Sequence, residues 1–207
     1  MTILGDLGYS SYMPEIKIIV KGYAKKLANG WVANSNVCLI TAGDKRIIVD
    51  PGCNREKLLT ALGKEGLETK DIDYVFITHA HPDHGMLAGL FENAKSITWD
   101  TKLTYDNDQI TEWTPDMLGP DIKILETPGH MLEHISLLVT TEKGKVAIAG
   151  DVIFWTDDEE QIFKIDQPDH SQAKGMNMED LIESRKKLVE LADYIIPGHG
   201  NIFKVNK

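Results

Sequence analysis

The chain has 207 residues, of which 42% are hydrophobic and 26% are charged, and its formal net charge is −10. This length supports one hydrophobic core without cross-links, and the composition argues against disorder. No apolar run is long enough to span a membrane, and the negative charge gives no electrostatic footprint for nucleic acid. We therefore expect a single domain over residues 1–207.

The N-terminus and the cysteines favour a cytoplasmic location. Residues 1–6 lack the basic start and the long apolar core of a signal peptide. Only Cys38 and Cys53 are present, which is too few for a disulfide framework. Neither cysteine stands at a metal-ligand spacing, so we expect both to be buried and inert.

Predicted strands and helices alternate along the chain. Asn54 and Asn177 each precede a helical pattern and fit the N-cap position. The predicted helices follow these two residues, and a third, short one covers residues 84–92. The predicted strands cover residues 15–21, 35–41, 45–49, 73–77, 95–99, 121–126, 135–140, 145–149 and 194–196. This alternation indicates α/β layering.

Two long stretches, residues 100–120 and 152–175, give no strand or helix pattern. Unstructured loops of this length in a compact domain are usually functional or disordered. Trp113, Trp155 and Phe163 lie in them. These aromatic side chains either form a pocket wall or pack the loops onto the domain.

Four polar residues cluster directly behind the predicted strand 73–77: His79, His81, Asp83 and His84. Imidazole suits zinc and iron, and a carboxylate can reach a second metal. Side chains two residues apart in an extended segment point the same way, so His79 and His81 can coordinate one ion. The chain then turns at Pro82 and presents Asp83 and His84 to another. A structural histidine is usually alone, so this cluster predicts a metal site.

Further candidate ligands end other predicted strands. His130 and His199 each follow a Pro-Gly pair, and Asp151 follows Gly150. Sheets of α/β proteins place their sites at the carboxyl ends of strands, and glycine lets the backbone approach a metal closely. We expect His134 to pack or hydrogen-bond near the site and His170 to lie on the surface.

In this order of ligands the chain resembles the metallo-β-lactamase superfamily. The match is HxHxDH at residues 79–84 followed by His130, Asp151 and His199, and it covers about residues 16–205. The resemblance implies an αββα sandwich with a binuclear metal centre along one edge. It implies a first metal held by His79, His81 and His130. It implies a second metal held by Asp83, His84 and His199, with Asp151 bridging the two.

Two finer resemblances follow. Asp50 matches the strand-ending aspartate that supports the metal loop in this superfamily, whereas the residues alone indicate a turn aspartate before Pro-Gly. The segments 150–154, 184–188 and 197–200 resemble the branch of metallo-β-lactamase domain-containing protein 1. The branch resemblance implies RNA as an alternative substrate.

The chemistry expected of these ligands is hydrolysis. Two cations about 3.5–4 Å apart share a bridging water and lower its pKa from about 15.7 towards about 7. We predict a binuclear metal-dependent hydrolase that uses a metal-bridging hydroxide, with two divalent ions, zinc first and iron or manganese as alternatives. Asp83 and Asp151 are the predicted catalytic residues.

The acidic surface favours a small ester, thioester or lactone as the substrate over RNA. A metal-dependent single-strand RNase is the first alternative function. A non-heme iron oxygenase or a non-catalytic metal-binding protein is the second. We expect no membrane partner, and the oligomeric state is left open, a homodimer included.

Overall fold

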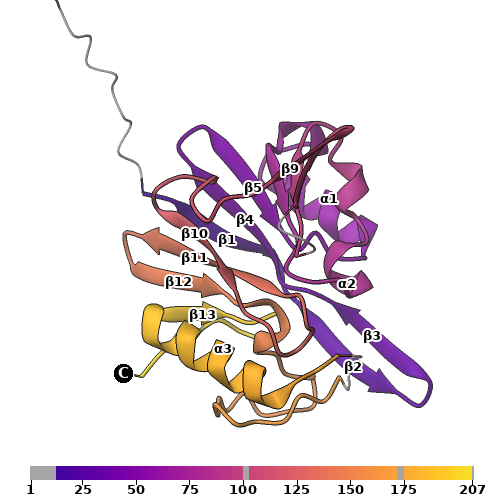
Figure 1. Ribbon diagram of the computed structural model, residues 1–207. Helices are drawn as coiled ribbons and strands as arrows, with labels where there is room; N and C mark the ends of the chain where they lie inside the picture. Colours follow the sequence, from indigo (N-terminus) through magenta and orange to yellow (C-terminus); the bar gives the residue numbers. More distant parts are fainter. Residues whose placement is uncertain (1–12, 100–102, 172–174, 207) are drawn as a thin grey trace, which may run out of the picture.

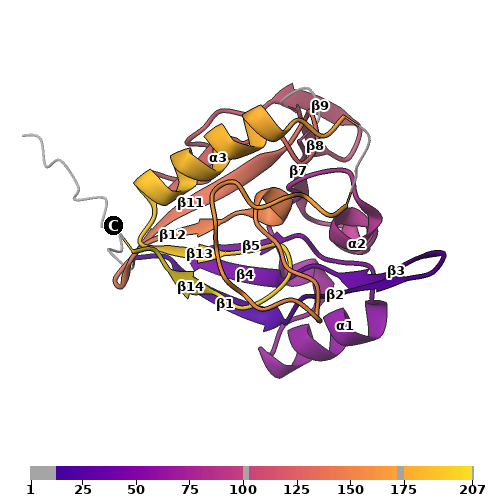
Figure 2. The same ribbon diagram turned by 90° about the horizontal axis from the view of Figure 1, so that it is seen from below.

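The computed structural model describes residues 13–99, 103–171 and 175–206. Two β-sheets lie face to face, and helices cover their outer sides (Figure 1). Figure 2 shows α3 (Met178–Leu191) over one sheet and α1 (Arg55–Lys64) on the opposite side of the molecule. The expected α/β fold class, with the layers of an αββα sandwich, is confirmed. The single-domain prediction for residues 1–207 stays a prediction, since residues 1–12 lie outside the described ranges.

The first sheet has the strand order β1-β4-β5-β6-β7-β8-β9. The pairs β5/β6 and β6/β7 are parallel, and the other neighbours are antiparallel. The strands are β1 (Glu15–Val20), β4 (Val37–Ala42), β5 (Lys45–Val49), β6 (Tyr74–Phe76), β7 (Lys95–Ile97), β8 (Leu103–Asp106) and β9 (Gln109–Glu112).

The second sheet has the order β10-β11-β12-β13-β14, in which only β12 and β13 pair in parallel. Its strands are β10 (Ile122–Glu126), β11 (Ile135–Thr141), β12 (Gly144–Ile148), β13 (Tyr194–Ile196) and β14 (Phe203–Lys204). The predicted strands are confirmed with end points shifted by up to two residues.

Three apolar layers hold the sandwich together. Ile40, Phe76 and Leu137 belong to the cluster between the two sheets, and all three are fully buried. A second cluster lies between the first sheet and α1, and a third lies between the second sheet and α3. Each fully buried side chain of this size stabilises the fold by about 1.5–3 kcal/mol.

Both predicted N-caps are confirmed. The side chain of Asn54 accepts a hydrogen bond from Lys57 N at the start of α1, and Asn177 accepts from Glu179 N and Asp180 N at the start of α3. The predicted helix 84–92 is wrong in detail, because it is split into α2 (Pro82–Gly85) and the 3₁₀ turn η2 (Ala88–Leu90). Leu87 N donates to Gly52 O at 3.1 Å instead of continuing the helical ladder.

Sequence analysis missed two hairpins. One, β2 (Tyr23–Leu27) with β3 (Gly30–Asn34), projects from the sandwich near α2 (Figure 1). The two turn residues are Ala28 and Asn29, and Gly30, which begins β3, has a φ of +139°. The dipeptide Asn29-Gly30 is a sequence signal typical of tight hairpins. The other, β8 with β9, lies inside the stretch 100–120, of which residues 100–102 are outside the described ranges.

The remaining elements are 3₁₀ turns: η1 (Thr69–Asp71) precedes β6, and η3 (Gly150–Val152) follows β12. In the described part of the chain, no helix is long and apolar enough to cross a lipid bilayer.

Candidate metal centre

All seven predicted ligands lie together at one edge of the sandwich, on the segments that leave four strands. His79, His81, Asp83 and His84 follow β6, and His130 follows β10. Asp151 lies in η3 behind β12, and His199 follows β13. Because β6 belongs to one sheet and the other three strands belong to the second, the site depends on the two sheets packing face to face.

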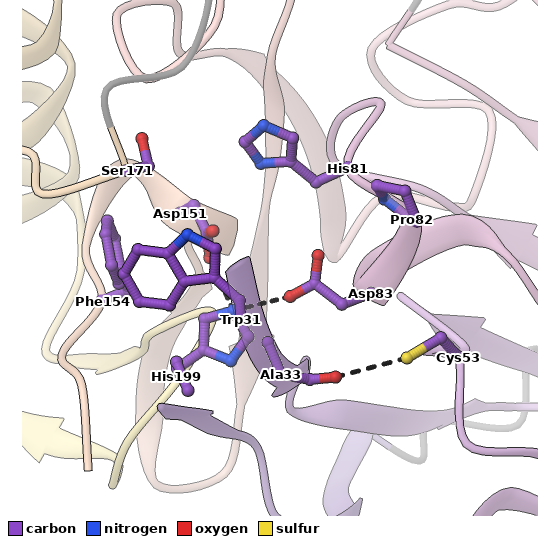
Figure 3. A pocket seen from close by; sticks show the side chains of 11 residues that line it. Trp31, Ala33, Cys53, His81, Pro82, Asp83, Asp151, Phe154, Ser171 and His199 are labelled. Atoms are coloured by element: carbon purple, nitrogen blue, oxygen red, sulfur yellow. Dashed lines mark hydrogen bonds and ion pairs between the residues drawn. The ribbon is translucent and has the colours of Figure 1, made fainter. Parts of the chain in front are cut away.

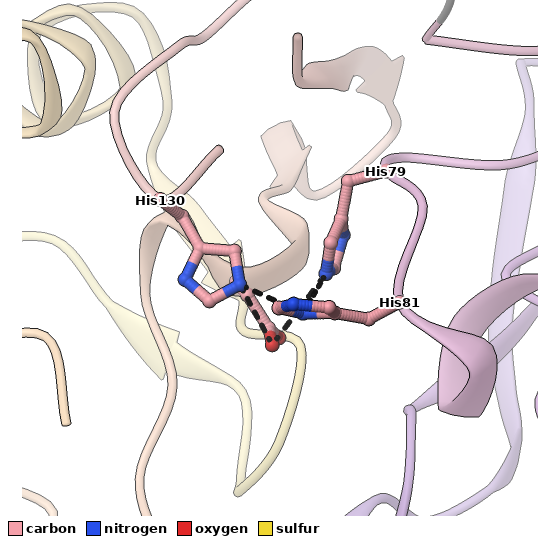
Figure 4. A group of neighbouring side chains, drawn as sticks. His79, His81 and His130 are labelled. Atoms are coloured by element: carbon pink, nitrogen blue, oxygen red, sulfur yellow. Dashed lines mark hydrogen bonds and ion pairs between the residues drawn. The ribbon is translucent and has the colours of Figure 1, made fainter. Parts of the chain in front are cut away.

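The first group of ligand atoms comes from His79, His81, His130 and Asp151. His79 Nε2 and His130 Nε2 lie 2.9 and 3.0 Å from His81 Nδ1. Asp151 Oδ2 is 3.8 Å from His79 Nε2 and 3.6 Å from His130 Nε2. Figure 4 shows the three rings pointing toward one another from three directions.

The second group comes from Asp83, His84 and His199. His199 Nε2 lies 3.2 Å from Asp83 Oδ2, and His84 Nε2 lies 4.0 Å from the same oxygen. Asp151 reaches this group with its other oxygen, since Oδ1 is 3.2 Å from His84 Nε2 and 3.5 Å from His199 Nε2. One carboxylate therefore faces both groups, with a different oxygen toward each.

The donor set and its burial fit metal ions. His79, His84 and His130 are fully buried, and Asp151 is 5% exposed. Within the described ranges, His84 Nε2 and Asp151 Oδ1 are buried polar atoms that form an ion pair at 3.2 Å but make no hydrogen bond. Such atoms are costly unless something binds them, and imidazole with carboxylate is a donor set that suits zinc and iron. The two groups together fit a site for two metal ions.

Outer contacts hold the ligand rings in place. Asp50, which has a φ of +48°, accepts from Thr78 N at 2.8 Å and from Thr78 Oγ1 at 2.9 Å. Its Oδ2 also lies 2.7 Å from His84 Nδ1. The metal-loop contact implied for Asp50 by the family resemblance is thus present. His199 Nδ1 lies 3.1 Å from the carbonyl oxygen of Asn34.

The two groups differ in charge when no metal is bound. Burial lowers the pKa of His79 well below its usual range and, with the nearby His130, lowers the pKa of His81. Burial also disfavours the charged form of His84 and His199, but Asp151 outweighs it. With Asp50 it raises the pKa of His84 well above the usual range, and with Asp83 it raises that of His199 to about 9. His79 and His81 therefore offer neutral ring nitrogens, whereas His84 and His199 must release protons on binding a metal.

The pKa of Asp151 is lowered well below its usual range. Burial opposes this shift, but the charges on His84 and His199 outweigh it. Asp151 is therefore ionised at neutral pH.

A cavity of about 380 Å³ opens onto the ligands (Figure 3). Figure 3 shows Trp31 and Phe154 close together, with Pro82, Asp83 and Cys53 across the cavity from them. The lining residues are Ala24, Trp31, Ala33, Cys53, His81, Pro82, Asp83, Asp151, Phe154, Ser171 and His199. None of these described lining residues is a lysine or an arginine.

The structure corrects the prediction for Cys53 and agrees with those for Cys38, His134 and His170. Cys38 is buried as expected, but Cys53 is exposed and lines the cavity, because it lies in the turn that leads from β5 to α1. His134 is buried and stacks on His79, and His170 is exposed beside Glu159, both as expected.

Of the aromatic residues in the long stretches, Trp155 and Phe163 pack on Phe203. Trp113 is buried in the cluster between the two sheets. Of the two alternatives, these three side chains therefore pack onto the domain, and none of them lines the cavity at the ligands.

Sequence analysis missed several residues around the site. Trp31 and Ala24 lie on the unpredicted hairpin, which the dipeptide Asn29-Gly30 could have revealed. Phe154 lines the cavity and lies beside the rings of His130 and His199. Asp169 was also missed, although its Oδ2 lies 2.5 Å from His130 Nδ1. No local pattern marks Asp169, because it is 39 positions from its partner.

Comparison with known proteins gives one family and close structural likenesses. The sequence model described as "Metallo-beta-lactamase superfamily" matches residues 30–114, which include the first four ligands. The chain is 31% identical to metallo-beta-lactamase domain-containing protein 1 of Xenopus laevis, over 96% of this chain and 86% of that protein.

Two solved structures resemble the fold. One is a Thermotoga maritima protein provisionally classed as a metallo-β-lactamase, with a TM-score of 0.69 and 24% identity, covering 93% of this chain and 100% of that chain. The other is AidC, a dizinc quorum-quenching lactonase in complex with a product, with a TM-score of 0.60 and 21% identity. That likeness covers 83% of this chain and 74% of the lactonase.

Proposed function

From the premise that this chain belongs to the metallo-β-lactamase superfamily and is a metal-dependent hydrolase, we propose that it binds two divalent ions and hydrolyses a small ester, thioester or lactone. Zinc is the proposed metal, since imidazole and carboxylate suit it and the similar lactonase is described as a dizinc protein. The proposed ligands are the seven residues of the two groups.

The observation that supports a binuclear site most directly is the position of Asp151. Its Oδ2 faces the first group and its Oδ1 faces the second, at distances of 3.2–3.8 Å from the nearest ring nitrogens. A carboxylate that served a single ion would need only one of these sets of neighbours. Asp151 is therefore the proposed bridge.

The ions, when bound, supply Lewis acidity that activates water at neutral pH and stabilises negative charge on the substrate. The chain supplies the geometry. Asp83 is partly exposed and lines the cavity, so its carboxylate lies beside any substrate there. Burial opposes ionisation of Asp83, but a hydrogen bond from His199 and the charge of His84 lower its pKa. Asp83 is therefore ionised at neutral pH, and its position beside the substrate is the reason to propose it as the group that takes a proton from the attacking water and returns it to the leaving group.

The cavity supports a small acyl substrate. Its volume of about 380 Å³ is near the low end for ligand sites. Trp31, Phe154 and Pro82 give it apolar walls, which suit a hydrocarbon acyl group. A phosphate chain such as RNA would be expected to contact lysine or arginine, and the described lining has neither. The net charge of −10 also slows the approach of a polyanion.

The test is a substrate screen on protein of known metal content. Purified protein is reconstituted with excess zinc, dialysed and analysed for metal. It is then assayed against aryl esters, acyl thioesters, N-acyl lactones and single-stranded RNA. Asp151→Asn prepared in parallel controls for contaminating hydrolases.

We expect two ions per chain and hydrolysis of at least one acyl class, lost on treatment with EDTA and in the variant. One ion or fewer after reconstitution would overturn the binuclear proposal. Metal-dependent cleavage of RNA with no acyl hydrolysis would put the RNase alternative first.

The two free cysteines are in keeping with the proposed cytoplasmic compartment, which is reducing. Fractionation of the native cells with detection of this chain would test that proposal.

A further inference from the structure

A buried carboxylate from the described residues 153–171, which follow η3, contacts one of the proposed ligands on the side of the ring that faces away from the metal site. Asp169 Oδ2 lies 2.5 Å from His130 Nδ1, and the side chains of both residues are fully buried. The other oxygen, Oδ1, accepts from Ser171 N at 2.8 Å and from Ser171 Oγ at 2.5 Å. Burial of a carboxylate is costly unless its oxygens are hydrogen-bonded, and both oxygens of Asp169 are.

This contact fixes which nitrogen of His130 can bind a metal. A carboxylate accepts only, so the proton of the ring is held on Nδ1. Nε2 then keeps its lone pair, and Nε2 is the atom that lies 3.0 Å from His81 Nδ1 and 3.6 Å from Asp151 Oδ2. A hydrogen bond of this kind sets the tautomer and orientation of a metal-binding histidine.

Each group of ligands contains one histidine that is backed by a carboxylate. In the second group His84 contacts Asp50, the aspartate that the family resemblance implies. In the first group the corresponding carboxylate is Asp169, whereas His79 Nδ1 lies 2.9 Å from the hydroxyl of Thr78. Asp169 therefore contacts the Nδ1 atom of a histidine in the first group in the same way that Asp50 contacts the Nδ1 atom of a histidine in the second group.

Helix α3 anchors both partners of this hydrogen bond. Arg185, which is 1% exposed, donates to the carbonyls of Val152, Ile165 and Gln167 at 2.8, 3.0 and 2.5 Å. These bonds fix the segment that ends in Asp169. Ser184 Oγ donates to Pro128 O at 2.6 Å, which fixes the turn before His130. The segments that carry Asp169 and His130 are thus both held by hydrogen bonds from one helix.

We propose that Asp169 is a positioning residue of the first metal site, and that the described residues 153–171, which follow η3, deliver it there. Asp169 keeps the proton of His130 on Nδ1 and the Nε2 lone pair directed at the metal. This inference rests on the proposed binuclear site.

The test compares Asp169→Asn with Asp166→Asn. Asp166 is an exposed residue of the same segment, so its variant makes the same change of charge away from the site. Metal-free wild type and variants are titrated with Zn²⁺ against a chelator, and with Co²⁺ while the visible spectrum is recorded. An amide at position 169 can present its NH₂ to His130, so loss of the carboxylate frees the ring to change tautomer. We expect one of the two Zn²⁺ ions to bind about 10–100-fold more weakly in Asp169→Asn. We also expect an altered Co²⁺ spectrum, with wild-type behaviour in Asp166→Asn.

A second measurement uses the wild type and does not depend on how the variant folds. In zinc-loaded protein labelled with ¹⁵N-histidine, the Nδ1 proton of His130 should give a resolved downfield signal that exchanges slowly with water. Fast exchange of this proton, as in free imidazole, would overturn the proposal.

The outcomes separate this proposal from the one it rests on. A wild type that binds two ions, with both affinities unchanged in Asp169→Asn, would overturn the role of Asp169 and leave the binuclear hydrolase standing. A wild type that binds fewer than two ions would overturn the proposed function itself.

Discussion

Gly198 is the position at which the smallest change should do most damage to the site. A methyl group built on Gly198 would fall inside the van der Waals envelope of Asp151 Oδ1 and would lie 3.0 Å from both Asp151 Cγ and Gly150 C. The backbone of Gly198 cannot withdraw easily. Its N–H lies 2.8 Å from Gly150 O and 3.0 Å from Ile153 O, and its carbonyl accepts from Asn36 N at 2.7 Å. In Gly198→Ala it is therefore the carboxylate of Asp151 that must move.

The size of the effect follows from that displacement. An ordinary contact between carbon and oxygen needs about 3.5 Å, so Oδ1 has to move by roughly 1 Å or more. A misplacement of about 1 Å at a reacting centre costs about 100-fold in rate. Overpacking in a buried site destabilises the fold by about 1–3 kcal/mol. We expect Gly198→Ala to lose at least one metal ion, about 100-fold or more in kcat/KM, and stability in this range.

The assay is metal content after dialysis, thermal unfolding, and kcat/KM on the substrate found in the acyl panel. Gly63→Ala is the matched control, because a methyl on this α1 residue meets no atom within 4 Å. That variant should gain about 0.5–1 kcal/mol, since alanine is the better helix former. Two bound ions and wild-type turnover in Gly198→Ala would refute the reasoning.

Three other predictions concern the bridge, the protons and the loop. Asp151→Asn should keep its fold, as judged by circular dichroism, but its kcat/KM should fall by more than ~100-fold. Mutation of a residue that only hydrogen-bonds to a metal ligand costs up to about that much, and an amide at position 151 neither bridges two cations well nor balances their charge. In metal-free protein, although burial disfavours its charge, Asp151 and Asp83 raise the pKa of His199 to about 9. Protonated His199 therefore stabilises the fold fully below about pH 6.5, the pKa of histidine in the unfolded chain, and this stabilisation is lost as the pH rises through 9. Thermal melts should show this loss only in protein without metal. Arg185→Met should lower the free energy of unfolding in urea by about 2–5 kcal/mol, since three carbonyls lose their donor, whereas Lys186→Met on the exposed side should leave it within about 0.5 kcal/mol.

The sequence by itself was sufficient to predict the α/β layers and to single out the seven candidate ligands that the structure brings together. The strands are short apolar runs, and the runs 122–126, 144–148 and 194–196 are each followed within two residues by glycine or proline and then by a candidate metal ligand. Both signals are local, so neither needs knowledge of which strands pair. The N-caps Asn54 and Asn177 were predictable for the same reason, because a cap bonds to backbone only two or three residues away.

Only the tertiary structure showed how far apart the candidate ligand atoms lie and which side chains surround them. That Asp151 turns one oxygen toward each group depends on η3 lying between segments from both sheets. The contact of Asp169 with His130, and the place of Trp31 in the cavity wall, join segments that no periodicity connects. Hydrophobic periodicity reports which face of an element is buried, but not which distant element covers it. The contacts that tune this site are set by that packing.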